Sequence, residues 1–418
     1  MSIRVEKAFE LAREAYGVLG VDALQAVNKA NSIPLSLHCW QGDDVGGFEN
    51  FGTGLTGGIA ATGNYPGKAR TPDELRGDLE AAMALIPGKQ KVNLHASYAE
   101  MGGKPVDRDR LSPEQFSGWA QWAVGRKIGL DFNPTYFSHP KAGEGTLTHR
   151  DPAIRQFWVD HGIACRKIGE YFGRTTGVTC INNIWLPDGA KDMPADSVAP
   201  RQRLMESLDA ILKEKIDPKY NKDAVESKLF GIGSEAYVAG SHEFYMGYAI
   251  RNNMMLTLDA GHFHPTEVIS AKIPALMLFL DELLLHVSRP VRWDSDHVVL
   301  FDDELNAIMA QIVRGGYESR VNIALDYFDA SINRVAAWAI GARNTRKALL
   351  KALLEPTAEL KKLEEAGDNT SVLALNEEYK SMPWAAVWDY CCLTAGVPVG
   401  AEWLAKVKEY EGNVLSKR

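Results

Sequence analysis

The sequence predicts a closed α/β barrel, the (β/α)8 or TIM architecture, with an N-terminal helix and a C-terminal helical extension. Eight short apolar runs alternate with amphipathic helical stretches along the 418 residues. Strands that alternate with helices indicate parallel βαβ units, and eight such units favour a closed barrel over an open sheet. Carboxylates and imidazoles also recur where the later runs end, which is the end of a barrel that carries its active site.

The eight predicted strands are short runs bounded by turn-forming residues. They span residues 33–40, 91–98, 129–136, 178–185, 223–230, 254–260, 283–288 and 321–327. We expect them to line one barrel in chain order, with a helix after each strand.

The predicted helices between the strands begin with capping signals. Ser/Thr-Pro or Asp-Pro patterns at 71–74, 112–115 and 151–152 place a capping side chain before proline at the first helical position. A long helix at 331–354 follows the last strand. The N-terminal residues form an amphipathic, charged helix that lacks the apolar core of a signal peptide.

Residues beyond the last barrel helix are charged and helical in pattern from 357 to 418, with breaks near Gly367 and Gly396. We therefore divide the chain into a barrel with its N-terminal helix, residues 1–355, and a C-terminal helical extension, residues 356–418. The extension is expected to pack on the barrel or on a neighbouring subunit.

A glycine-rich connection at 42–67 follows the first strand and is far longer than an ordinary βα loop. Its position at the carboxyl end of a strand favours a mobile lid over the substrate. Phe48, Phe51 and Tyr65 are aromatic residues that could cover a sugar. The alternatives are a surface linker and, with less support because no GK[ST] follows, a phosphate-binding loop.

Composition excludes several classes of function. The net charge of -8 argues against a nucleic-acid partner held by phosphate contacts. No apolar run reaches the roughly 18 residues of a membrane span, so no membrane association is expected. The five cysteines are odd in number and lack metal-finger spacing, which favours a reduced, cytoplasmic protein without disulfides.

The chemistry is concentrated between residues 259 and 326, where polar side chains end three apolar runs. They are Asp259, His262, His286, Asp294, Asp296 and Asp326. Burying such groups without a metal or a partner costs several kcal/mol, so a structural core does not need this pattern. Carboxylates and imidazoles at the mouths of buried strands indicate a site for a hard metal ion.

The individual motifs leave alternatives open. Asp294 and Asp296 stand two residues apart, so an extended chain would turn both carboxylates to one side, where they could chelate a cation. The same sequence is also typical of a solvated turn. Glu226 and Lys228, also two apart, could equally form a surface ion pair of little energetic value. His286 alone would more often be a core histidine.

Taken together, the potential ligands fall into two groups. Glu226, Asp259, His286 and Asp326 could hold one cation, whereas His262, Asp294 and Asp296 could hold another and leave positions open for water or substrate. Oxygen ligands with one imidazole each and no thiolate favour Mn²⁺, Mg²⁺ or Co²⁺ over a structural zinc. Without metal these carboxylates would repel one another, so chelation is expected to destabilise the fold.

Three segments around these residues resemble the L-rhamnose isomerase family, in the form found in enteric bacteria and bacilli. They are DAGHFHPTEVIS at 259–270, LLLHVSRPVRWDSDHVVL at 283–300 and LDYFDASINRVAAWAIG at 325–341. The resemblance extends over nearly the whole chain, to PWAAVWDY at 383–390. It implies an eight-stranded barrel similar to that of xylose isomerase, an added helical region and a homotetramer.

The resemblance also implies an activity: the reversible conversion of L-rhamnose to L-rhamnulose, an aldose–ketose exchange by an intramolecular oxidoreductase in rhamnose catabolism. It implies dependence on Mn²⁺, with Co²⁺, Mg²⁺ or Zn²⁺ as possible substitutes. By position, the family's catalytic metal ligands correspond to His262, Asp294 and Asp296. Its structural metal ligands correspond to Glu226, Asp259, His286 and Asp326.

The reaction moves a hydrogen between C2 and C1 of the open-chain sugar. Two routes are open, a metal-mediated 1,2-hydride shift and an enediol formed by a protein base, and the resemblance favours the hydride shift. Lys228 is expected to steady a developing oxyanion, and we count it and Asp326 with the catalytic groups. His95 is expected to assist ring opening or hold the ring oxygen, and Trp185 to shield the transfer from water.

Two other functions compete with isomerisation. A barrel hydrolase of the endonuclease type also uses His/Asp/Glu metal clusters, but it would need a basic face that this acidic chain lacks. A metal-stabilised sugar-binding or scaffold protein without turnover would have a closed site, whereas His262, Asp294 and Asp296 suggest open coordination. The sequence does not distinguish a pocket for L-rhamnose from one for L-mannose or L-lyxose.

Overall fold

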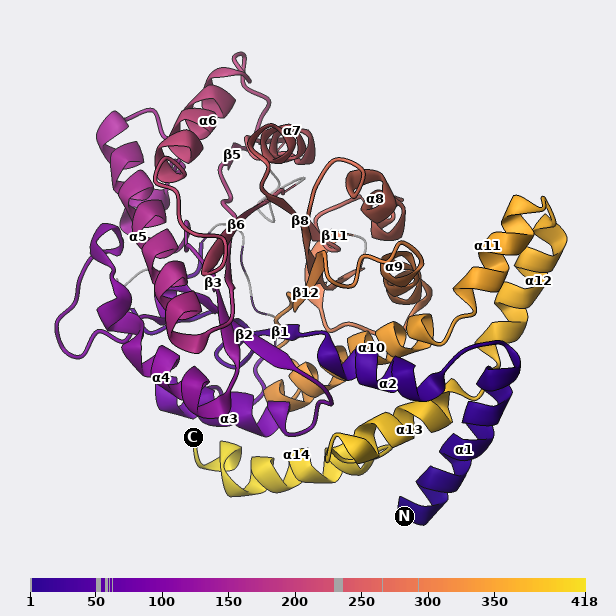
Figure 1. The fold of residues 1–418 in the computed structure, drawn as a ribbon. Coiled ribbons are helices and arrows are strands. Elements are labelled where there is room, and N and C mark those ends of the chain that lie inside the picture. The colour runs from indigo at the N-terminus through magenta and orange to yellow at the C-terminus, as the bar shows by residue number, and fades with distance from the viewer. Residues whose placement is uncertain are drawn as a thin grey trace.

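Eight parallel strands close into a barrel, as the sequence predicts (Figure 1). The computed structural model describes residues 2–49, 54–56, 59, 61, 63–228, 236–264, 266–291 and 293–418, without the side chains of 293–296. The barrel strands are β1 Leu35–His38, β2 Gln90–His95, β3 Gly129–Asn133, β4 Cys180–Ile184, β6 Asn221–Glu226, β8 Met255–Asp259, β9 Leu283–Val287 and β12 Val321–Leu325. They follow one another around the barrel in chain order, and β12 pairs with β1 to close it.

Helices surround the barrel in the order that βαβ units require (Figure 1). They are α3 Pro72–Met83, α4 Ser117–Arg126, α5 Pro152–Thr176, α6 Ala199–Ile211, α7 His242–Asn252, α8 Ile269–Leu276, α9 Asp303–Arg314 and α10 Arg334–Leu353. Short 3₁₀ segments occupy Cys39–Gln41, Ala96–Tyr98, Arg108–Arg110, Pro113–Phe116, Pro140–Ala142 and Leu415–Lys417. Apolar residues of the strands and the inner helix faces form the main core.

The predicted capping signals lie at the starts of helical segments. Thr71 accepts a hydrogen bond from the Glu74 backbone N–H at the start of α3, and Asp151 accepts one from Ala153 at the start of α5. The full capping box at Ser112 precedes a 3₁₀ turn, and α4 begins only after that turn. These caps satisfy backbone donors that the first turn of a helix leaves without partners.

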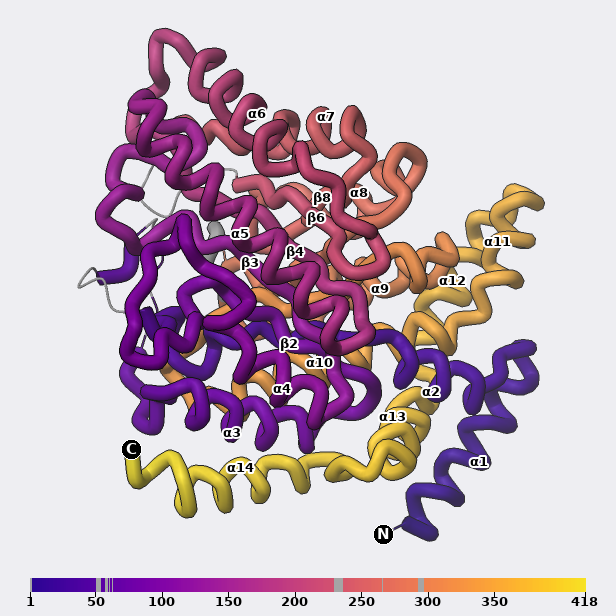
Figure 2. Tube along the Cα trace, turned by 60° about the vertical axis from the view of Figure 1, so that its left-hand side comes forward, coloured from indigo at the N-terminus to yellow at the C-terminus, as the bar shows by residue number. Residues whose placement is uncertain are grey.

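Helices at both ends of the chain lie beside the barrel. They are α1 Ser2–Val18, α2 Ala23–Ser32, α11 Thr357–Glu365, α12 Asn369–Lys380, α13 Trp384–Thr394 and α14 Glu402–Asn413. Phe9 of α1 stacks on Tyr390 of α13 with ring centroids 3.8 Å apart. Figure 2 shows α13 and α14 running along one side of the barrel, with α1 next to α13. The chain breaks near Gly367 and Gly396 agree with the prediction, whereas the break before α13 was not foreseen.

The strand boundaries differ from the predicted ones in a consistent way. Most barrel strands end one to three residues earlier than expected, because the chain turns out of the sheet while its side chains remain buried. Trp40, Tyr98 and Trp185 all lie beyond their strands and are still at most 8% exposed. Burial therefore continues past the last hydrogen-bonded residue, so the apolar pattern runs longer than the strand does. The predicted strand residues 229 and 230 lie outside the described part of the chain.

Two small antiparallel pairs were not predicted. β5 Gly189–Ala190 pairs with β7 Tyr237–Val238, and β10 Arg289–Val291 pairs with β11 Trp293–His297. The second pair places the WDSDH segment in an extended ribbon after β9, which agrees with the extended-chain interpretation of its backbone and disagrees with the turn.

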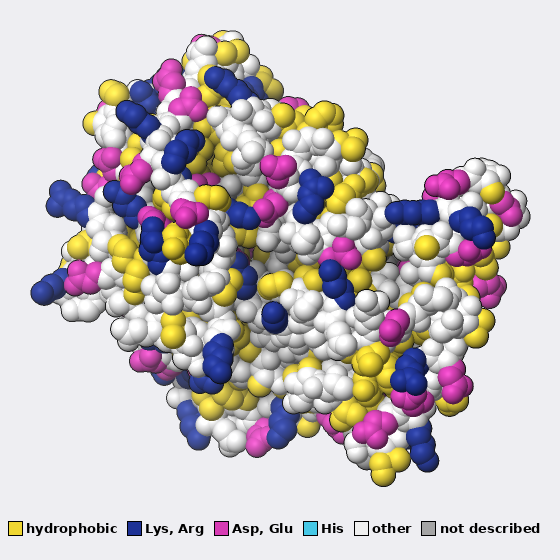
Figure 3. All heavy atoms as spheres, viewed as in Figure 1, with side chains coloured by type: hydrophobic (Ala, Val, Ile, Leu, Met, Phe, Trp, Pro, Cys, Tyr) yellow, Lys and Arg dark blue, Asp and Glu magenta, His cyan; other side chains and the backbone are white. Residues whose placement is uncertain are grey.

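The surface charges, the helix lengths and the cysteines can be compared with the expectations from composition. Lysine, arginine and acidic side chains are interspersed on the face shown in Figure 3. Among the described residues, none of the helices has both the length and the apolar character needed to cross a membrane. All five cysteines are buried and unpaired.

Candidate metal centre

Four predicted ligands come together at the carboxyl ends of four neighbouring strands. Glu226 and Asp259 are the last residues of β6 and β8, His286 lies one residue before the end of β9, and Asp326 directly follows β12. The register pairs Asp259 with His286 across β8 and β9. One potential ligand atom from each of the four side chains lies within 4.8 Å of the others.

The imidazole of His286 is at the centre of this group. Its Nδ1 lies 3.1 Å from Oδ2 of Asp326, 3.3 Å from Oε1 of Glu226 and 3.6 Å from Oδ2 of Asp259. Glu226, Asp259 and His286 are buried. Three carboxylates therefore converge on the imidazole of His286, two of them fully buried and the third, Asp326, partly exposed.

The outer oxygens of Glu226 and Asp326 are held by donors from the barrel. Asn183 donates through Nδ2 to Oε2 of Glu226 at 2.5 Å, and its own Oδ1 accepts from the Thr257 hydroxyl at 2.6 Å. Trp40 donates through Nε1 to Oδ1 of Asp326 at 3.0 Å. Each carboxylate is thereby fixed with its other oxygen directed at His286.

The third carboxylate is held in the same way. The Gly261 backbone N–H donates to Oδ1 of Asp259 at 2.6 Å, and the Ser288 hydroxyl donates to the same oxygen at 3.2 Å. Gly261 follows β8 and Ser288 follows β9, so the two turns beyond these strands orient the side chain that lies between them. Such outer contacts are how proteins orient metal ligands.

The inner atoms of the group have the properties of metal ligands. Oε1 of Glu226, Oδ2 of Asp259 and both ring nitrogens of His286 are buried and form no hydrogen bond with any of the described residues. Buried polar atoms without partners are costly and rare in native proteins. Three carboxylates and one imidazole are ligands suited to a divalent cation, so this group fits a metal ion.

The pKa values of His286 and Asp326 indicate that the group holds more negative than positive charge. Burial alone would lower the pKa of His286, but the charge of Glu226 and the contacts with Asp259 and Asp326 raise it well above its usual range. Burial raises the pKa of the Asp326 carboxyl to about 6, although His286 opposes that shift. The His286 ring is therefore favoured in its protonated, positively charged form, and the Asp326 carboxyl is shifted toward its neutral form. Both shifts are expected of carboxylates that lack a counter-ion.

The second predicted group is only partly described. His262 donates through Nδ1 to the Ser227 carbonyl at 2.9 Å, and this nitrogen lies 3.3 Å from Oε1 of Glu226. That tautomer leaves Nε2 as the nitrogen that would bind a metal. Asp294 and Asp296 belong to β11, but their side chains lie outside the described residues.

A cavity beside the metal group contains the other predicted site residues. His95, Trp185 and Lys228 line it together with Glu226 and His262. The Lys228 ammonium lies 4.8 Å from the Trp185 ring centroid. Lys228 is 1% exposed and Glu226 is 2% exposed, so the surface ion-pair interpretation of these two residues is wrong. His264 is exposed and lines a different cavity.

Several residues of this site were not found from the sequence. Trp40, Asn183 and Ser288 hold the carboxylates, and Asn133 and Phe137 line the cavity. All five are at, or within four residues of, the carboxyl end of a barrel strand. That position was the only signal available, because buried aromatic and amide residues are common in any core.

The glycine-rich connection is described only in part. Phe48 packs edge-to-face on Tyr98, and the Tyr65 hydroxyl donates to Glu411 of α14 at 2.6 Å. Tyr65 thus contacts the C-terminal extension, and its role in covering a sugar stays a prediction. Phe51 lies outside the described residues.

Comparison with known proteins gives a consistent result over the whole chain. The family model for L-rhamnose isomerase (RhaA) matches residues 3–418. The chain is 60% identical over 414 residues to the L-rhamnose isomerase of Mannheimia succiniciproducens, covering 99% of each chain. It is 58% identical over 419 residues to that of Escherichia coli strain K12, covering 100% of each. A solved D-psicose 3-epimerase from Clostridium cellulolyticum H10 has a TM-score of 0.45 and 13% identity, covering 76% of this chain and 96% of that one; this likeness is too distant to carry an argument.

Proposed function

Because the chain belongs to the L-rhamnose isomerase family, we propose that it interconverts L-rhamnose and L-rhamnulose, an aldose and its ketose. The observation that carries this proposal is the match of the family model to residues 3–418. The buried group of three carboxylates and one imidazole supports it, because this exchange needs a polarised carbonyl. Neither the barrel hydrolase nor the sugar-binding scaffold has comparable support.

We further propose two divalent cation sites. Glu226, Asp259, His286 and Asp326 would hold a structural ion, and His262, Asp294 and Asp296 a catalytic one. The ligand chemistry and the family resemblance favour Mn²⁺, with Co²⁺, Mg²⁺ or Zn²⁺ as substitutes. When bound, the cations would supply Lewis-acid polarisation of the sugar carbonyl for a 1,2-hydride shift between C2 and C1.

The chain's own residues would bind and enclose the sugar. Lys228 borders the cavity and would donate to a sugar oxygen that gains charge during the transfer. Trp185 and Phe137 contact each other edge-to-face at 5.6 Å and give the cavity an apolar wall, which excludes water from the reacting carbons. His95 lies on the same cavity and would contact the sugar through its ring N–H.

Three further features are proposed, the first on the family resemblance and the other two on the pattern of the sequence. The protein would assemble as a homotetramer, the segment 42–67 would act as a lid, and residues 356–418 would form an extension distinct from the barrel at 1–355. Light scattering coupled to size-exclusion chromatography measures the first directly, and a monomeric mass would contradict it.

The activity is tested by ketose formation from L-rhamnose with protein stripped by EDTA, assayed with and without Mn²⁺. We expect activity only with metal, none from Asp294→Ala, and full activity from Asp192→Ala, a matched substitution at an exposed position. A folded, metal-loaded protein that makes no ketose would refute the proposal. L-mannose and L-lyxose assayed in parallel would then show whether another aldose is the substrate.

The hydride route is tested with L-rhamnose carrying deuterium at C2. A hydride shift keeps the deuterium in the ketose, now on C1, whereas an enediol exchanges it with water. Complete loss of label to solvent would therefore reject the shift and leave the isomerase activity standing.

A further inference from the structure

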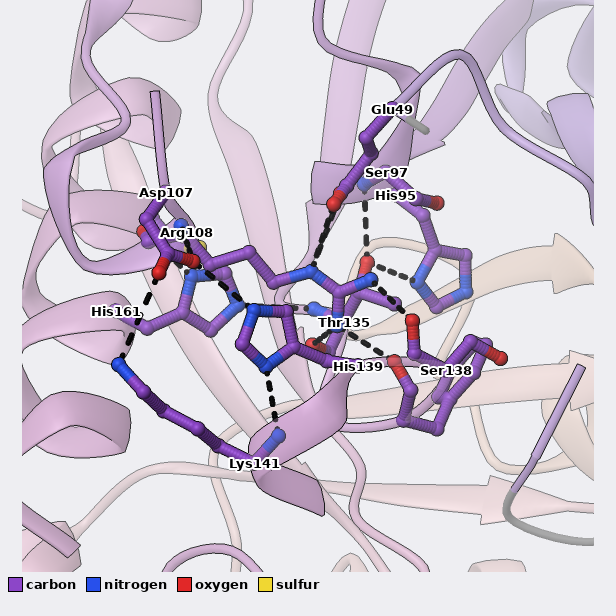
Figure 4. Close-up of polar contacts among 12 residues, drawn as sticks. Glu49, His95, Ser97, Asp107, Arg108, Thr135, Ser138, His139, Lys141 and His161 are labelled. Carbon is purple, nitrogen blue, oxygen red and sulfur yellow. Dashed lines mark hydrogen bonds and ion pairs between the residues drawn. The ribbon is translucent and has the colours of Figure 1, made fainter. Parts of the chain in front are cut away.

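Thr135 connects a buried polar network to His95 in the cavity. Thr135 lies just beyond β3 and is fully buried. Its hydroxyl oxygen accepts a hydrogen bond from the Ser97 backbone N–H at 3.1 Å and lies 3.3 Å from Nδ1 of His95 (Figure 4). The other ring nitrogen of His95 points away from this network in the same view. The two nitrogens of the ring therefore face different partners.

The backbone of Thr135 is clamped from both sides, so its hydroxyl has a fixed place. Nη1 of Arg108 donates to the Thr135 carbonyl at 2.6 Å, and the Thr135 N–H donates to Nε2 of His161 at 3.2 Å. Since Nε2 of His161 accepts, its Nδ1 carries the proton and donates to the Arg108 carbonyl at 3.0 Å. Arg108 is held in turn by a buried ion pair with Glu49 at 3.0 Å (Figure 4).

The number of hydrogens available decides which atom donates in the contact between the Thr135 hydroxyl and Nδ1 of His95. One lone pair of the Thr135 oxygen is used by the Ser97 N–H. If Nδ1 of His95 carried a proton, it would donate to the second lone pair, and the hydroxyl hydrogen would be buried without an acceptor. Among the described residues, this hydroxyl forms no other hydrogen bond. If Nδ1 is unprotonated, the hydroxyl donates to it and every group is satisfied.

We propose that Thr135 is a positioning residue that keeps His95 as the Nε2–H tautomer, so that the ring presents a fixed hydrogen-bond donor to a sugar oxygen in the cavity. Only the identity of the sugar rests on the proposed function. Burial lowers the pKa of His95 to about 3, so the ring is neutral near pH 7 and its tautomer decides its role. A ring of this tautomer donates to the substrate through Nε2 and cannot take a proton there.

The tautomer is measured by NMR on deuterated protein carrying ¹⁵N-labelled histidine, using long-range correlations from both ring nitrogens to the ring C–H protons. The His95 signals are assigned by their absence in His95→Gln. We expect a protonated Nε2 and an unprotonated Nδ1 in the parent protein and in Thr135→Ser, which keeps the hydroxyl. In Thr135→Val, which has nearly the same shape, we expect the two tautomers to mix.

A protonated Nδ1 in the parent would overturn the proposal, and this spectrum needs no variant to fold. An unchanged Nε2–H tautomer in folded Thr135→Val would also overturn it, because another group would then set the ring. If Thr135→Val alone fails to fold, the spectra of the parent and of Thr135→Ser decide whether the proposal holds.

Activity separates this proposal from the proposed function. We expect kcat/KM for L-rhamnose to fall about 3- to 10-fold in Thr135→Val relative to Thr135→Ser, as for one neutral hydrogen bond. A parent with the expected tautomer and no ketose formation would support the positioning role and refute the substrate. Ketose formation by a parent protein in which Nδ1 of His95 is protonated would refute the positioning role and support the substrate.

Discussion

Replacing Trp40 by phenylalanine removes one donor from the metal group and leaves an aromatic ring in its place. The Trp40 indole N–H donates to Oδ1 of Asp326 at 3.0 Å, and the Asp326 side chain is 18% exposed. A hydrogen bond to a charged acceptor contributes about 1.5–3 kcal/mol. Because Asp326 is partly solvated, the lower end of that range applies, and the affinity for a cation bound by Asp326 is expected to fall about tenfold.

The assay is a titration of EDTA-stripped protein with Mn²⁺, followed by the electron paramagnetic resonance signal of the free ion. Trp119→Phe is a matched control, because Trp119 is also fully buried and its indole donates at 3.0 Å to the Tyr98 carbonyl, which is not a predicted metal ligand. Equal Mn²⁺ affinity in Trp40→Phe and the parent, or an equal loss in both tryptophan variants, would refute the reasoning.

Three other predictions follow from the same contacts. EDTA should lower the melting temperature of the parent protein, whereas Glu226→Gln should melt lower in Mn²⁺ and respond less to EDTA; a melting temperature unmoved by EDTA would contradict this. Lys228→Met should reduce kcat about 100-fold while Mn²⁺ affinity stays within threefold of the parent, and unchanged turnover would exclude a role at a charged transition state. Burial raises the pKa of Asp43 to about 7, so the folded state holds its proton more tightly than the unfolded state does, and stability is lost as pH rises from about 4 to 7. Urea unfolding at pH 5 and pH 8 should show a loss about 3 kcal/mol smaller in Asp43→Asn than in the parent, and identical pH dependence would contradict the assignment.

The strands were predictable because a parallel barrel buries both faces of each strand. The runs LLL at 283–285 and IAL at 323–325 show this directly: each is followed by a polar residue, and the structure places them in β9 and β12. The β10–β11 ribbon was not predictable in the same way. Its strand β10 has only three residues, Arg289–Val291, which is too short to show an alternation of apolar and polar side chains. Strand ends were also missed, since buried residues such as Tyr98 continue the apolar pattern after the sheet hydrogen bonds stop.

The gathering of the four potential metal ligands was predictable for a related reason. Asp259 and Asp326 are charges at the ends of apolar runs, which is expensive without a counter-ion. Their supporting donors were not predictable, because Trp40 and Asn183 resemble ordinary core residues and only the closed barrel brings them to the carboxylates. Thr135 is similar: its role depends on a contact with His95 across two neighbouring strands, and no spacing in the sequence encodes that contact.

The two ends of the barrel treat buried carboxylates differently, and the difference argues for a bound cation. Toward the N-terminal ends of the strands, Asp131 is paired with Lys91 at 2.5 Å and Asp223 with Arg166 at 2.9 Å, so each charge has a counter-ion within the chain. Removing one member of such a pair leaves an uncompensated buried charge. At the carboxyl ends, three inward-facing carboxylates surround the imidazole of His286, His262 Nδ1 lies 3.3 Å from Glu226, and the chain holds the outer oxygens with neutral donors. The first arrangement is complete as the chain folds, whereas in the described part of the chain the second leaves carboxylate charge that a bound cation would balance.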